Sequence, residues 1–508
     1  MVKKNRIFLI VAPMIVALIY ISIALNSGVI LRRSEKRQSI VTEKLISQTS
    51  SLIEIMDSVK ISPDGKRIAY IEPAGSKQIM VIDGKASRHY DSIMAGSPYF
   101  SPDSKRVAYT AQLGDKWTVV VDGKESGWFD GITTNPTFSP DSKRLAFGVR
   151  VGEKRFVIVD GQAQKFKYDF QGNMFTFSPD SKRLAYTAQL GEDWVVVVDD
   201  KPGKKYDDIL FFSFSPDSRR IAYSARLGEK YFVVTDGKEG QYYDGILETT
   251  PIFSPNSKHI AYVAKQDDKR FVVVDGKEKK YYTAIGRYSL LFSPDSRYLA
   301  YAAQLDGKWF IVKNDEEGER YDGIGNTLVF SPDSNRIAYT ALKGNKWFVI
   351  TDGTAGQPYD GIAIGTPVFS PDSKCIAYVA FGGKKQLVVV DEKEDKKYDG
   401  IIENSLAFSP DGRHLAYAAQ LGKKQFIVEN GEEHKKYDFI CSAPVFNSDG
   451  EQLAYSAQVG DKWTIVINRK EGKYYEGGII NVEKGGAFSS EGIQYFAFKD
   501  NCIYWVEE

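Results

Sequence analysis

The stretch Phe177-Ser178-Pro179-Asp180-Ser181-Lys182-Arg183-Leu184-Ala185-Tyr186 occurs twelve times, with variations, in this chain of 508 residues. Successive copies lie about 39 residues apart, a period typical of a repeat architecture. The other copies begin at Ile61, Phe100, Phe138, Phe214, Phe253, Phe292, Phe330, Phe369, Phe408, Phe446 and Phe488. Every other motif in the chain has to be interpreted as part of this repeat.

One repeat, residues 136–171, illustrates the local structure that the sequence predicts. A short extended piece leads into the turn Pro140-Asp141-Ser142, and residues 145–150 then alternate as a half-buried strand. A β-branched run at 156–159 ends in Asp160-Gly161, a strong signal for a hairpin turn. A fourth strand carries Tyr168-Asp169. Four strands in about 39 residues make one propeller blade, and no helical period of useful length follows residue 50. The sequence predicts an all-β chain, a β-propeller of twelve four-stranded blades.

The string Phe-Ser-Pro-Asp-x-x-Arg-Leu-Ala-Tyr, repeated over residues 55–508, resembles the WD40-like repeat called PD40. This repeat occurs in TolB-type propellers and in the propellers of the prolyl-oligopeptidase and dipeptidyl-peptidase families. The resemblance implies a propeller, and we expect neither the hydrolase domain of the peptidases nor the extra N-terminal domain of TolB. The copies at Phe446-Asn447-Ser448-Asp449 and Phe488-Ser489-Ser490-Glu491 lack the proline, as terminal repeats often depart from the consensus.

The chain ends after the third strand of the last repeat, and Leu52–Ile55 is predicted to supply the missing fourth strand. Twelve blades exceed the usual four to eight of one ring. We therefore predict two six-bladed rings, repeats 1–6 in residues 51–280 and repeats 7–12 in residues 281–508, with one large ring as the alternative. The recurrent Tyr-Asp-Gly-Ile becomes Tyr282-Thr283-Ala284-Ile285 at this boundary.

The N-terminus predicts a membrane segment. A basic tail, residues 1–6, precedes the uncharged apolar stretch 7–26, which is long enough to nearly span a bilayer core as a helix. A polar tether, 27–50, follows. The segment is predicted to be an uncleaved signal anchor, which places the propeller outside the cytoplasm, on a single-pass membrane protein. Export after signal cleavage is the alternative. Basic residues flank both sides, so charge bias does not fix the orientation.

The charge balance argues against a nucleic-acid binder. Lysine and arginine total 67 against 66 acidic residues, whereas binding to phosphates requires a surplus of cations. Cys375, Cys441 and Cys502 match no paired-cysteine pattern. The four histidines are scattered, and no motif typical of a hydrolase, a metalloprotease or a phosphate-binding loop occurs. We expect no cofactor, no metal site and no catalytic residues.

Recurrent acids and tryptophans are interpreted as structural. One Asp stands in each Ser-Pro-Asp turn and another in each Tyr-Asp-Gly-Ile, and both kinds are expected to stabilise turns instead of binding metal. Five tryptophans that open third strands are expected to lie between blades and solvent; they are Trp117, Trp194, Trp309, Trp347 and Trp463.

The segments that differ most between copies are the most promising binding surface. They are predicted to connect the fourth strand of one blade to the first strand of the next, on one rim of the propeller, where loops on a rigid scaffold often carry function. Candidate rim residues are Asn135, Asn173, Glu248, Arg287, Tyr288, Asn326 and Asn404. The predicted function is a membrane-anchored, non-catalytic scaffold that binds a protein or cell-envelope ligand. The alternative is a propeller-type lyase or hydrolase with a site at the mouth of the channel.

Overall fold

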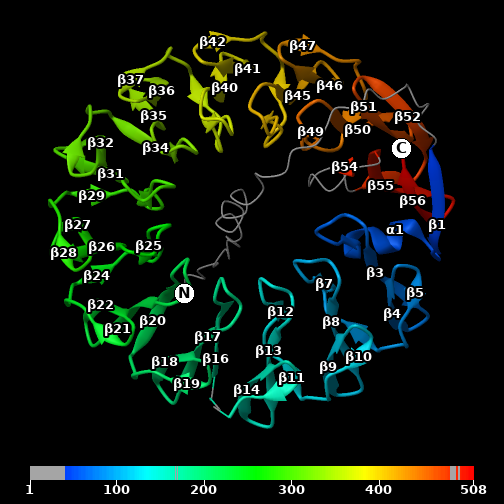
Figure 1. Cartoon of the computed structure of the whole chain (residues 1–508), viewed down its shortest axis with the longest axis horizontal. Helices are drawn as coiled ribbons and strands as arrows, with labels where there is room; N and C mark the ends of the chain where they lie inside the picture. Colours follow the sequence, from blue (N-terminus) through cyan, green and yellow to red (C-terminus); the bar gives the residue numbers. More distant parts are fainter. Residues whose placement is uncertain (1–40, 166–167, 169, 481–487, 490–491) are drawn as a thin grey trace, which may run out of the picture. The chain divides into compact units, whose positions relative to one another are not determined.

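The computed structural model describes residues 41–508 except 166–167, 169, 481–487 and 490–491. In this part of the chain twelve antiparallel sheets follow one another, one for each repeat (Figure 1). Each sheet contains a long second strand, and these are β3 Ile68–Ala74, β8 Val107–Leu113, β13 Leu145–Val151, β17 Leu184–Leu190, β21 Ile221–Leu227, β26 Ile260–Gln266, β31 Leu299–Leu305, β35 Ile337–Lys343, β40 Ile376–Gly382, β45 Leu415–Leu421, β50 Leu453–Val459 and β55 Gly492–Lys499.

Each second strand forms a hairpin with a third strand of six residues. The third strands are β4 Lys77–Ile82, β9 Lys116–Val121, β14 Lys154–Val159, β18 Asp193–Val198, β22 Lys230–Thr235, β27 Lys269–Val274, β32 Lys308–Lys313, β36 Lys346–Thr351, β41 Lys385–Val390, β46 Lys424–Glu429, β51 Lys462–Ile467 and β56 Cys502–Glu507. These hairpins form the middle of every blade, and the predicted all-β propeller of twelve four-stranded blades is confirmed.

Blade 2 shows the order of strands from the inner side of the blade outward. The innermost strand is split into β6, Ser92–Ile93, and β7, Tyr99–Phe100, which both pair with β8. The third strand β9 then turns into β10, Lys124–Glu125. The turn between them is Asp122-Gly123, with φ of 50° and 80°. Positive φ at both residues is what a type I′ hairpin requires, so the turn predicted from the Asp-Gly dipeptides is confirmed.

The twelve blades form one ring, so the prediction of two six-bladed rings is wrong. Packing continues without a break near residue 280, because Val263 and Tyr282 of blade 6 share a hydrophobic cluster with Tyr301 and Phe310 of blade 7. The last blade also packs on the first. Its Phe496, Phe498 and Ile503 lie in one cluster with Ile68 and Tyr70 of blade 1. The weaker Tyr-Asp-Gly-Ile motif at residue 282 is therefore a local variation and marks no ring boundary.

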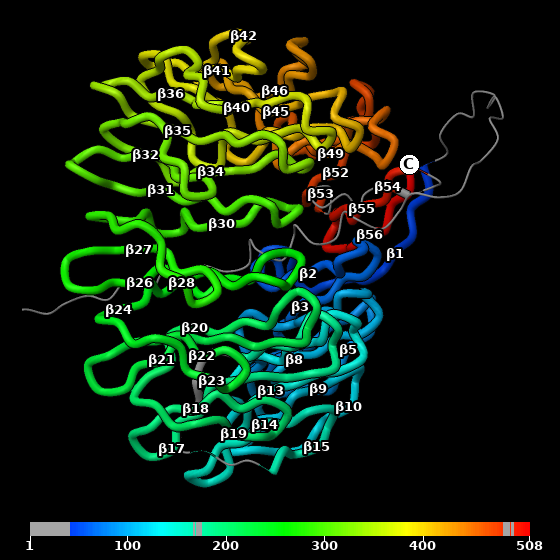
Figure 2. The backbone as a smooth tube through the Cα atoms, turned by 60° about the vertical axis from the view of Figure 1, so that its left-hand side comes forward, coloured from blue at the N-terminus to red at the C-terminus, as the bar shows by residue number. Residues whose placement is uncertain are grey.

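The ring is closed by β1, Thr42–Gln48, which pairs antiparallel with β56 and completes the last blade (Figure 2). Glu43 of β1 accepts hydrogen bonds from Tyr475 and Lys473 of blade 11, as Glu125 accepts one from Tyr90 between blades 1 and 2. Closure by an N-terminal strand was predicted, but the predicted segment is wrong: Leu52–Ile55 forms the single helical turn α1. β1 lies inside the predicted polar tether, where its exposed edge position allows a polar sequence.

An arginine of each regular repeat links its blade to the next. In blade 3 the Nε of Arg144 donates to Asp160 at 3.2 Å, within the same blade. Its NH1 donates across the interface to the carbonyl oxygens of Ser181 and Lys182, at 3.3 and 2.7 Å. The guanidinium also lies over the ring of Phe177 in blade 4, 5.2 Å from its centroid. This contact between blades was not predicted, because the sequence alone shows only that the arginine recurs in the repeat.

The arginine link recurs at other interfaces. An arginine bound to its own Asp-Gly carboxylate and stacked on the phenylalanine of the next blade is found at Arg67, Arg106, Arg183, Arg220 and Arg336. The backbone of the preceding turn adds a contact, since the N–H of Asp141 donates to Ser181 Oγ of the next blade at 2.8 Å. The residues of the repeat motif thus serve mainly to join neighbouring blades.

The predicted membrane segment, residues 7–26, lies outside the described residues. Among the residues that are described, no helix has the length and apolar character needed to cross a membrane.

Replacement of Arg144 by Ala tests the arginine link. The variant loses three hydrogen bonds of a charged group and a cation–π contact, and we expect its free energy of unfolding to fall by about 1–3 kcal/mol. Urea denaturation followed by circular dichroism measures the change. Lys143→Ala is the matched control, because the Lys143 side chain is 82% exposed and should leave stability unchanged. Equal stability of the two variants would show that the link contributes nothing.

Candidate functional site

The acids of the Ser-Pro-Asp turns are occupied by their own turns. Asp333 Oδ1 accepts hydrogen bonds from Ser331 Oγ at 2.5 Å and from the N–H of Asn335 at 3.1 Å. These bonds favour the ionised form and lower the pKa of Asp333 to about 2. Asp372 makes the same contacts with Ser370 and Lys374, and its pKa is also lowered to about 2. The structural interpretation of these acids is confirmed by their contacts.

The acids of the Tyr-Asp-Gly-Ile segments are held in a similar way. Asp360 accepts from Lys346 Nζ through one oxygen, at 2.5 Å, and from the N–H of Gly383 through the other, at 2.6 Å. The hydrogen bond from Lys346 is the main cause of a lowered pKa of Asp360. The same pair of contacts recurs at Asp130, Asp322, Asp399 and Asp438. These carboxylates hold the chain in place where it passes from one blade to the next.

Histidines and cysteines are dispersed over the fold. His259 and His414 stand in the arginine position of their repeats and contact Asp275 and Asn430. His434 is buried between Tyr455 and Glu429, and burial lowers its pKa. Within the described part of the chain, no group of three or more His, Cys, Asp and Glu side chains could hold a metal ion.

The variable segments lie at a different place from the one predicted. Gly245–Ile246, β24, and Ile252–Phe253, β25, both pair with β26, so the segment 247–251 interrupts the innermost strand of blade 6. The step from one blade to the next occurs earlier, at the Tyr-Asp pair. Figure 1 shows β7, β12 (Thr137–Phe138) and β25 on the inner side of the ring. The variable segments are therefore inner loops, set into the strands that face the centre.

A hydroxyl side chain makes each inner loop compatible with the sheet. In blade 7, Ser289 Oγ accepts from the N–H of Ala302 in β31 at 3.0 Å and donates to the carbonyl of Gly286 at 2.8 Å. The hydroxyl thus replaces the backbone partner that a continuous strand would offer. Equivalent bonds are made by Thr250, Thr366 and Ser405. A Ser or Thr at this fixed place was the sequence signal for an inner loop.

The candidate rim residues of blades 6 and 7 lie together. Arg287 forms an ion pair with Glu248 across the interface, and its guanidinium is 5.2 Å from the ring centroid of Tyr288. Tyr288 has a positive φ of 65° and is 60% exposed. Ile364, in the inner loop of blade 9, is 91% exposed and was not among the candidates. Large exposed apolar side chains on inner loops are a feature of interaction surfaces.

The remaining candidates are spread around the ring. Asn326 is exposed within β34, Gly323–Phe330, a continuous innermost strand, and Asn404 is exposed in the inner loop of blade 10 with φ of 58°. Asn173 belongs to β16, Phe170–Phe177, but its side chain is outside the part that the structure describes. The structure therefore joins Glu248, Arg287 and Tyr288 and places the other candidates on separate blades.

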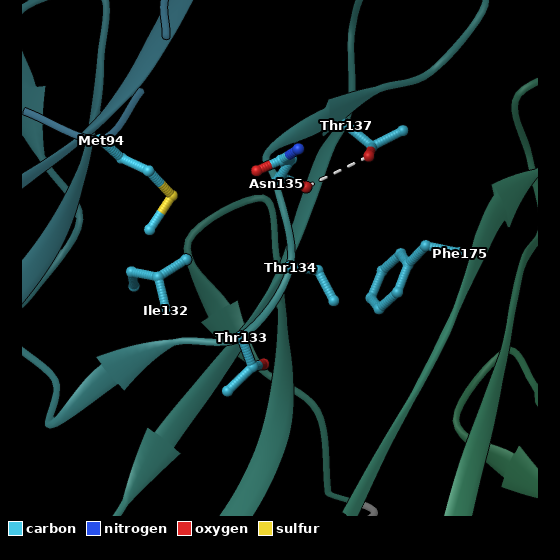
Figure 3. Close-up of a pocket in the computed structure, with 7 residues that line it drawn as sticks. All are labelled: Met94, Ile132, Thr133, Thr134, Asn135, Thr137 and Phe175. Carbon is cyan, nitrogen blue, oxygen red and sulfur yellow. Dashed lines mark hydrogen bonds between the residues drawn. The ribbon is translucent and has the colours of Figure 1, made fainter. Parts of the chain in front are cut away.

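Asn135 lines a cavity of about 400 Å³ between the innermost strands of blades 2, 3 and 4. Figure 3 shows the side chains of Thr134 and Phe175 pointing toward one another from neighbouring blades, with Met94 on the other side. Thr134 Oγ1 accepts from the N–H of Gly148 at 2.8 Å. A side chain at position 148 would collide with the loop, since an added Cβ would lie 2.4 Å from Thr133 Oγ1. Other repeats carry a side chain there, so Gly148 was the sequence signal for the close approach of this loop to β13.

The tryptophans that open third strands are half-buried between blades. Trp194 packs against the cluster of blades 4 and 5, Trp309 against that of blades 7 and 8, and Trp463 against that of blades 11 and 12. This confirms the predicted position between the blades and solvent for these three tryptophans, which belong to separate interfaces of the described chain.

Comparison with known proteins adds little. No protein-family model and no curated protein sequence matches this chain. Solved structures similar to it include a eukaryotic initiation factor (13% identity, 66% of this chain, 96% of that chain, TM-score 0.36). TolB from Acinetobacter baumannii is another (20%, 42%, 62%, 0.22), and the Dos1 propeller a third (12%, 61%, 93%, 0.29). Similarity at this level carries no information on function, and the PD40 resemblance stays a prediction.

The low pKa values of the turn carboxylates predict acid sensitivity. Asp333 and Asp372 titrate at about 2 in the folded chain against an ordinary value of 3.8. Because the folded pKa is depressed, the stabilisation is present above the ordinary pKa and is lost as pH falls through the folded pKa. We expect the melting temperature to fall slightly between about pH 7 and pH 5, because the unfolded chain protonates His434 while burial keeps it neutral in the fold, and to fall more steeply between about pH 4 and pH 2 as the turn carboxylates are protonated.

Asp141→Asn provides the matched variant for this measurement. Asn256 already occupies the same position in blade 6 and accepts from Ser254 Oγ and the N–H of Lys258. The variant should therefore fold normally at pH 7 and lose less stability in acid than the parent chain. An unchanged acid profile would show that the turn carboxylates do not govern it.

Proposed function

We propose that this chain is a non-catalytic binding scaffold whose inner loops contact a protein or cell-envelope partner. The proposal rests on a difference between the recurring and the varying residues of each repeat. The residues that recur, such as Arg144, Asp141 and Asp360, are engaged in hydrogen bonds inside or between blades. The residues that vary lie on inner loops, and several of them are exposed.

The chemistry of the inner loops supports a macromolecular partner. Tyr288 presents a large apolar surface next to the charged pair Arg287–Glu248, and Ile364 presents another on the inner loop of blade 9. Exposed aromatic and aliphatic side chains beside charged groups are typical of protein contact surfaces. The carboxylates that a propeller lyase or hydrolase would need are engaged by lysines, hydroxyls and backbone N–H groups, which favours the scaffold over the enzyme.

We further propose that residues 7–26 anchor the chain in the cell membrane with the propeller outside the cytoplasm. The proposal rests on the uncharged apolar stretch, which as a helix is long enough to nearly span a bilayer core. Export after signal cleavage would place the propeller in the same compartment and leave it unanchored.

Site-specific photo-crosslinking tests the inner loops as the contact surface. A benzophenone amino acid is introduced at Tyr288, Ile364 or Asn404 of the full-length protein in its native cells. We expect the three positions to give the same adduct, because the loops would face one partner. Tyr242, exposed at an outer strand and bonded to Glu239, is the matched control and should give none.

Digestion of the adduct identifies its nature. An adduct shortened by protease beyond the mass of this chain is a protein partner, and one shortened by a polysaccharide hydrolase is a wall polymer. Adducts at Tyr242 alone, or unrelated adducts at the three loops, would contradict the proposal.

Protease accessibility tests the localisation. We expect added protease to cut the propeller in intact cells, or in cells whose outer layer has been opened, because the chain beyond residue 26 would be exported. A cytoplasmic protein serves as the control for lysis. Protection that ends only when the cytoplasmic membrane is broken would place the propeller inside the cell and overturn the proposal.

A further inference from the structure

At the interface of blades 6 and 7, the guanidinium that links blades at the regular interfaces is absent. Blade 6 carries His259 where blade 3 carries Arg144. The groups that contact the arginine at the interface of blades 3 and 4 are kept in blades 6 and 7: an acceptor carboxylate, Asp275, a phenylalanine, Phe292, and the turn with the carbonyls of residues 296 and 297. The shorter imidazole bonds to Asp275 at 2.7 Å and does not replace the bonds that NH1 makes across the interface.

A cavity occupies this place. It has a volume of about 340 Å³ and is lined by His259 of blade 6 and by Phe292, Ser296, Arg297 and Tyr301 of blade 7. Phe292, Ser296 and Arg297 correspond in the repeat to Phe177, Ser181 and Lys182, the three residues that contact Arg144. The cavity therefore coincides with the site that an arginine side chain fills at the regular interfaces.

The tyrosine of the repeat also borders the cavity. Tyr301 is only 2% exposed, and its hydroxyl has no hydrogen-bond partner among the described residues. The equivalent hydroxyls of Tyr186 and Tyr378 are in the same state at interfaces that the arginine links, so the hydroxyl is a feature of the repeat and the case for a ligand rests on the cavity itself. The carbonyl of Arg297 accepts one bond, from Asn314 Nδ2 at 3.2 Å, and retains a second lone pair.

The cations around the cavity are already paired. Lys279 contacts Asp315 at 2.6 Å, and Arg297 forms an ion pair with Asp295. The groups left to receive a ligand are therefore the aromatic face of Phe292 and the carbonyl oxygens of Ser296 and Arg297, which together suit a cation with several donors.

Two other irregular interfaces are filled by a neighbouring ring. At the interface of blades 7 and 8, Tyr298 replaces the arginine and stacks on Phe330 at 6.4 Å with Lys313 over its face. At that of blades 10 and 11, His414 lies against Phe446 at 6.2 Å. At these two interfaces an aromatic ring takes the place of the arginine, so a cavity is not a necessary result of losing it.

We propose that the cavity between blades 6 and 7 is a binding site for a guanidinium group, supplied by an arginine side chain of a partner or by a small guanidino compound. The ligand would lie over Phe292, donate to the carbonyls of Ser296 and Arg297, and share Asp275 with His259. This site is separate from the inner loops and goes beyond the scaffold function proposed for them.

Binding of N-acetyl-L-arginine amide to the full-length protein, measured by calorimetry, tests the site. We expect saturable binding of one ligand per chain and at least about tenfold weaker binding of the citrulline analogue, which is neutral and has nearly the same shape. His259→Arg supplies the guanidinium in cis, so it should abolish binding and raise the melting temperature. Tyr301→Phe should keep the fold and weaken binding severalfold.

Arg220→His is the matched variant at the neighbouring interface. It leaves Phe253 without the guanidinium that lies 5.3 Å from its ring, and we expect it to create a second binding site and to lower the melting temperature.

Tighter binding of a glycine-flanked arginine peptide than of the amide would assign the site to a protein partner, and equal affinity would assign it to a small guanidino compound. Binding that is absent, equal for citrulline, unaffected by His259→Arg, or replaced by binding of phosphate would overturn the proposal.

Discussion

The burial of each blade between its two neighbours is the constraint on which the whole ring depends. Alternate residues of a second strand point to opposite faces of the sheet, and in this chain the two faces belong to different hydrophobic clusters. Ala185 packs with blade 5, whereas the next residue, Tyr186, packs with blade 3. In the described part of the chain the hydrophobic clusters lie between blades and not within them, so each repeat is stable only through its neighbours. The strand β1 is as necessary as any complete blade, because it completes the edge at which the last blade meets the first.

The polar residues of the repeat set the distance between blades. Tyr206 at the outer edge of blade 4 meets Tyr223 of blade 5 edge-to-face at 6.0 Å and donates to Glu239 at 3.1 Å. The arginine link acts on the side of the turns, and the tyrosine pair acts nearer the outer strands. Two contacts at different radii fix the angle between blades. The Tyr-Asp-Gly-Ile segment is therefore structural in each of its parts, from the tyrosine of one blade to the first strand of the next.

The sequence predicts the blade better than it predicts the ring. The strand at Leu145–Val151, the turn at Asp160-Gly161 and the structural role of the recurrent acids all depend on neighbours within one or two repeats, and these predictions are confirmed. The half-buried alternation expected for that strand is wrong, because neighbouring blades cover both of its faces and Leu145 to Val149 are all buried. The number of blades in a ring depends on the angle between adjacent sheets, which is set by the packing of pairs such as Tyr206–Tyr223. In a single ring of twelve blades, the angle between adjacent blades is half of that in a ring of six. No residue pattern in the sequence indicates that difference. β1 was not predicted for another reason. Most of its residues are exposed to solvent, so its sequence is largely polar.

The candidate site shows the same distinction between local and distant causes. The sequence identified the variable segments because they break the repeat, but their position inside the innermost strand follows from pairing with strands about 13 residues later, as between Ser289 and Ala302. Asn256, His259, Tyr298 and Asn314 also break the repeat, and they cluster at one stretch of blades 6 and 7. A boundary between rings would have explained them, yet the hydrophobic packing of Val263 and Phe310 continues through this interface. His259, Tyr298 and Asn314 line the cavity at this interface, so the chemistry of the cavity accounts for these three departures, whereas Asn256 bonds only within its own turn and to the next blade.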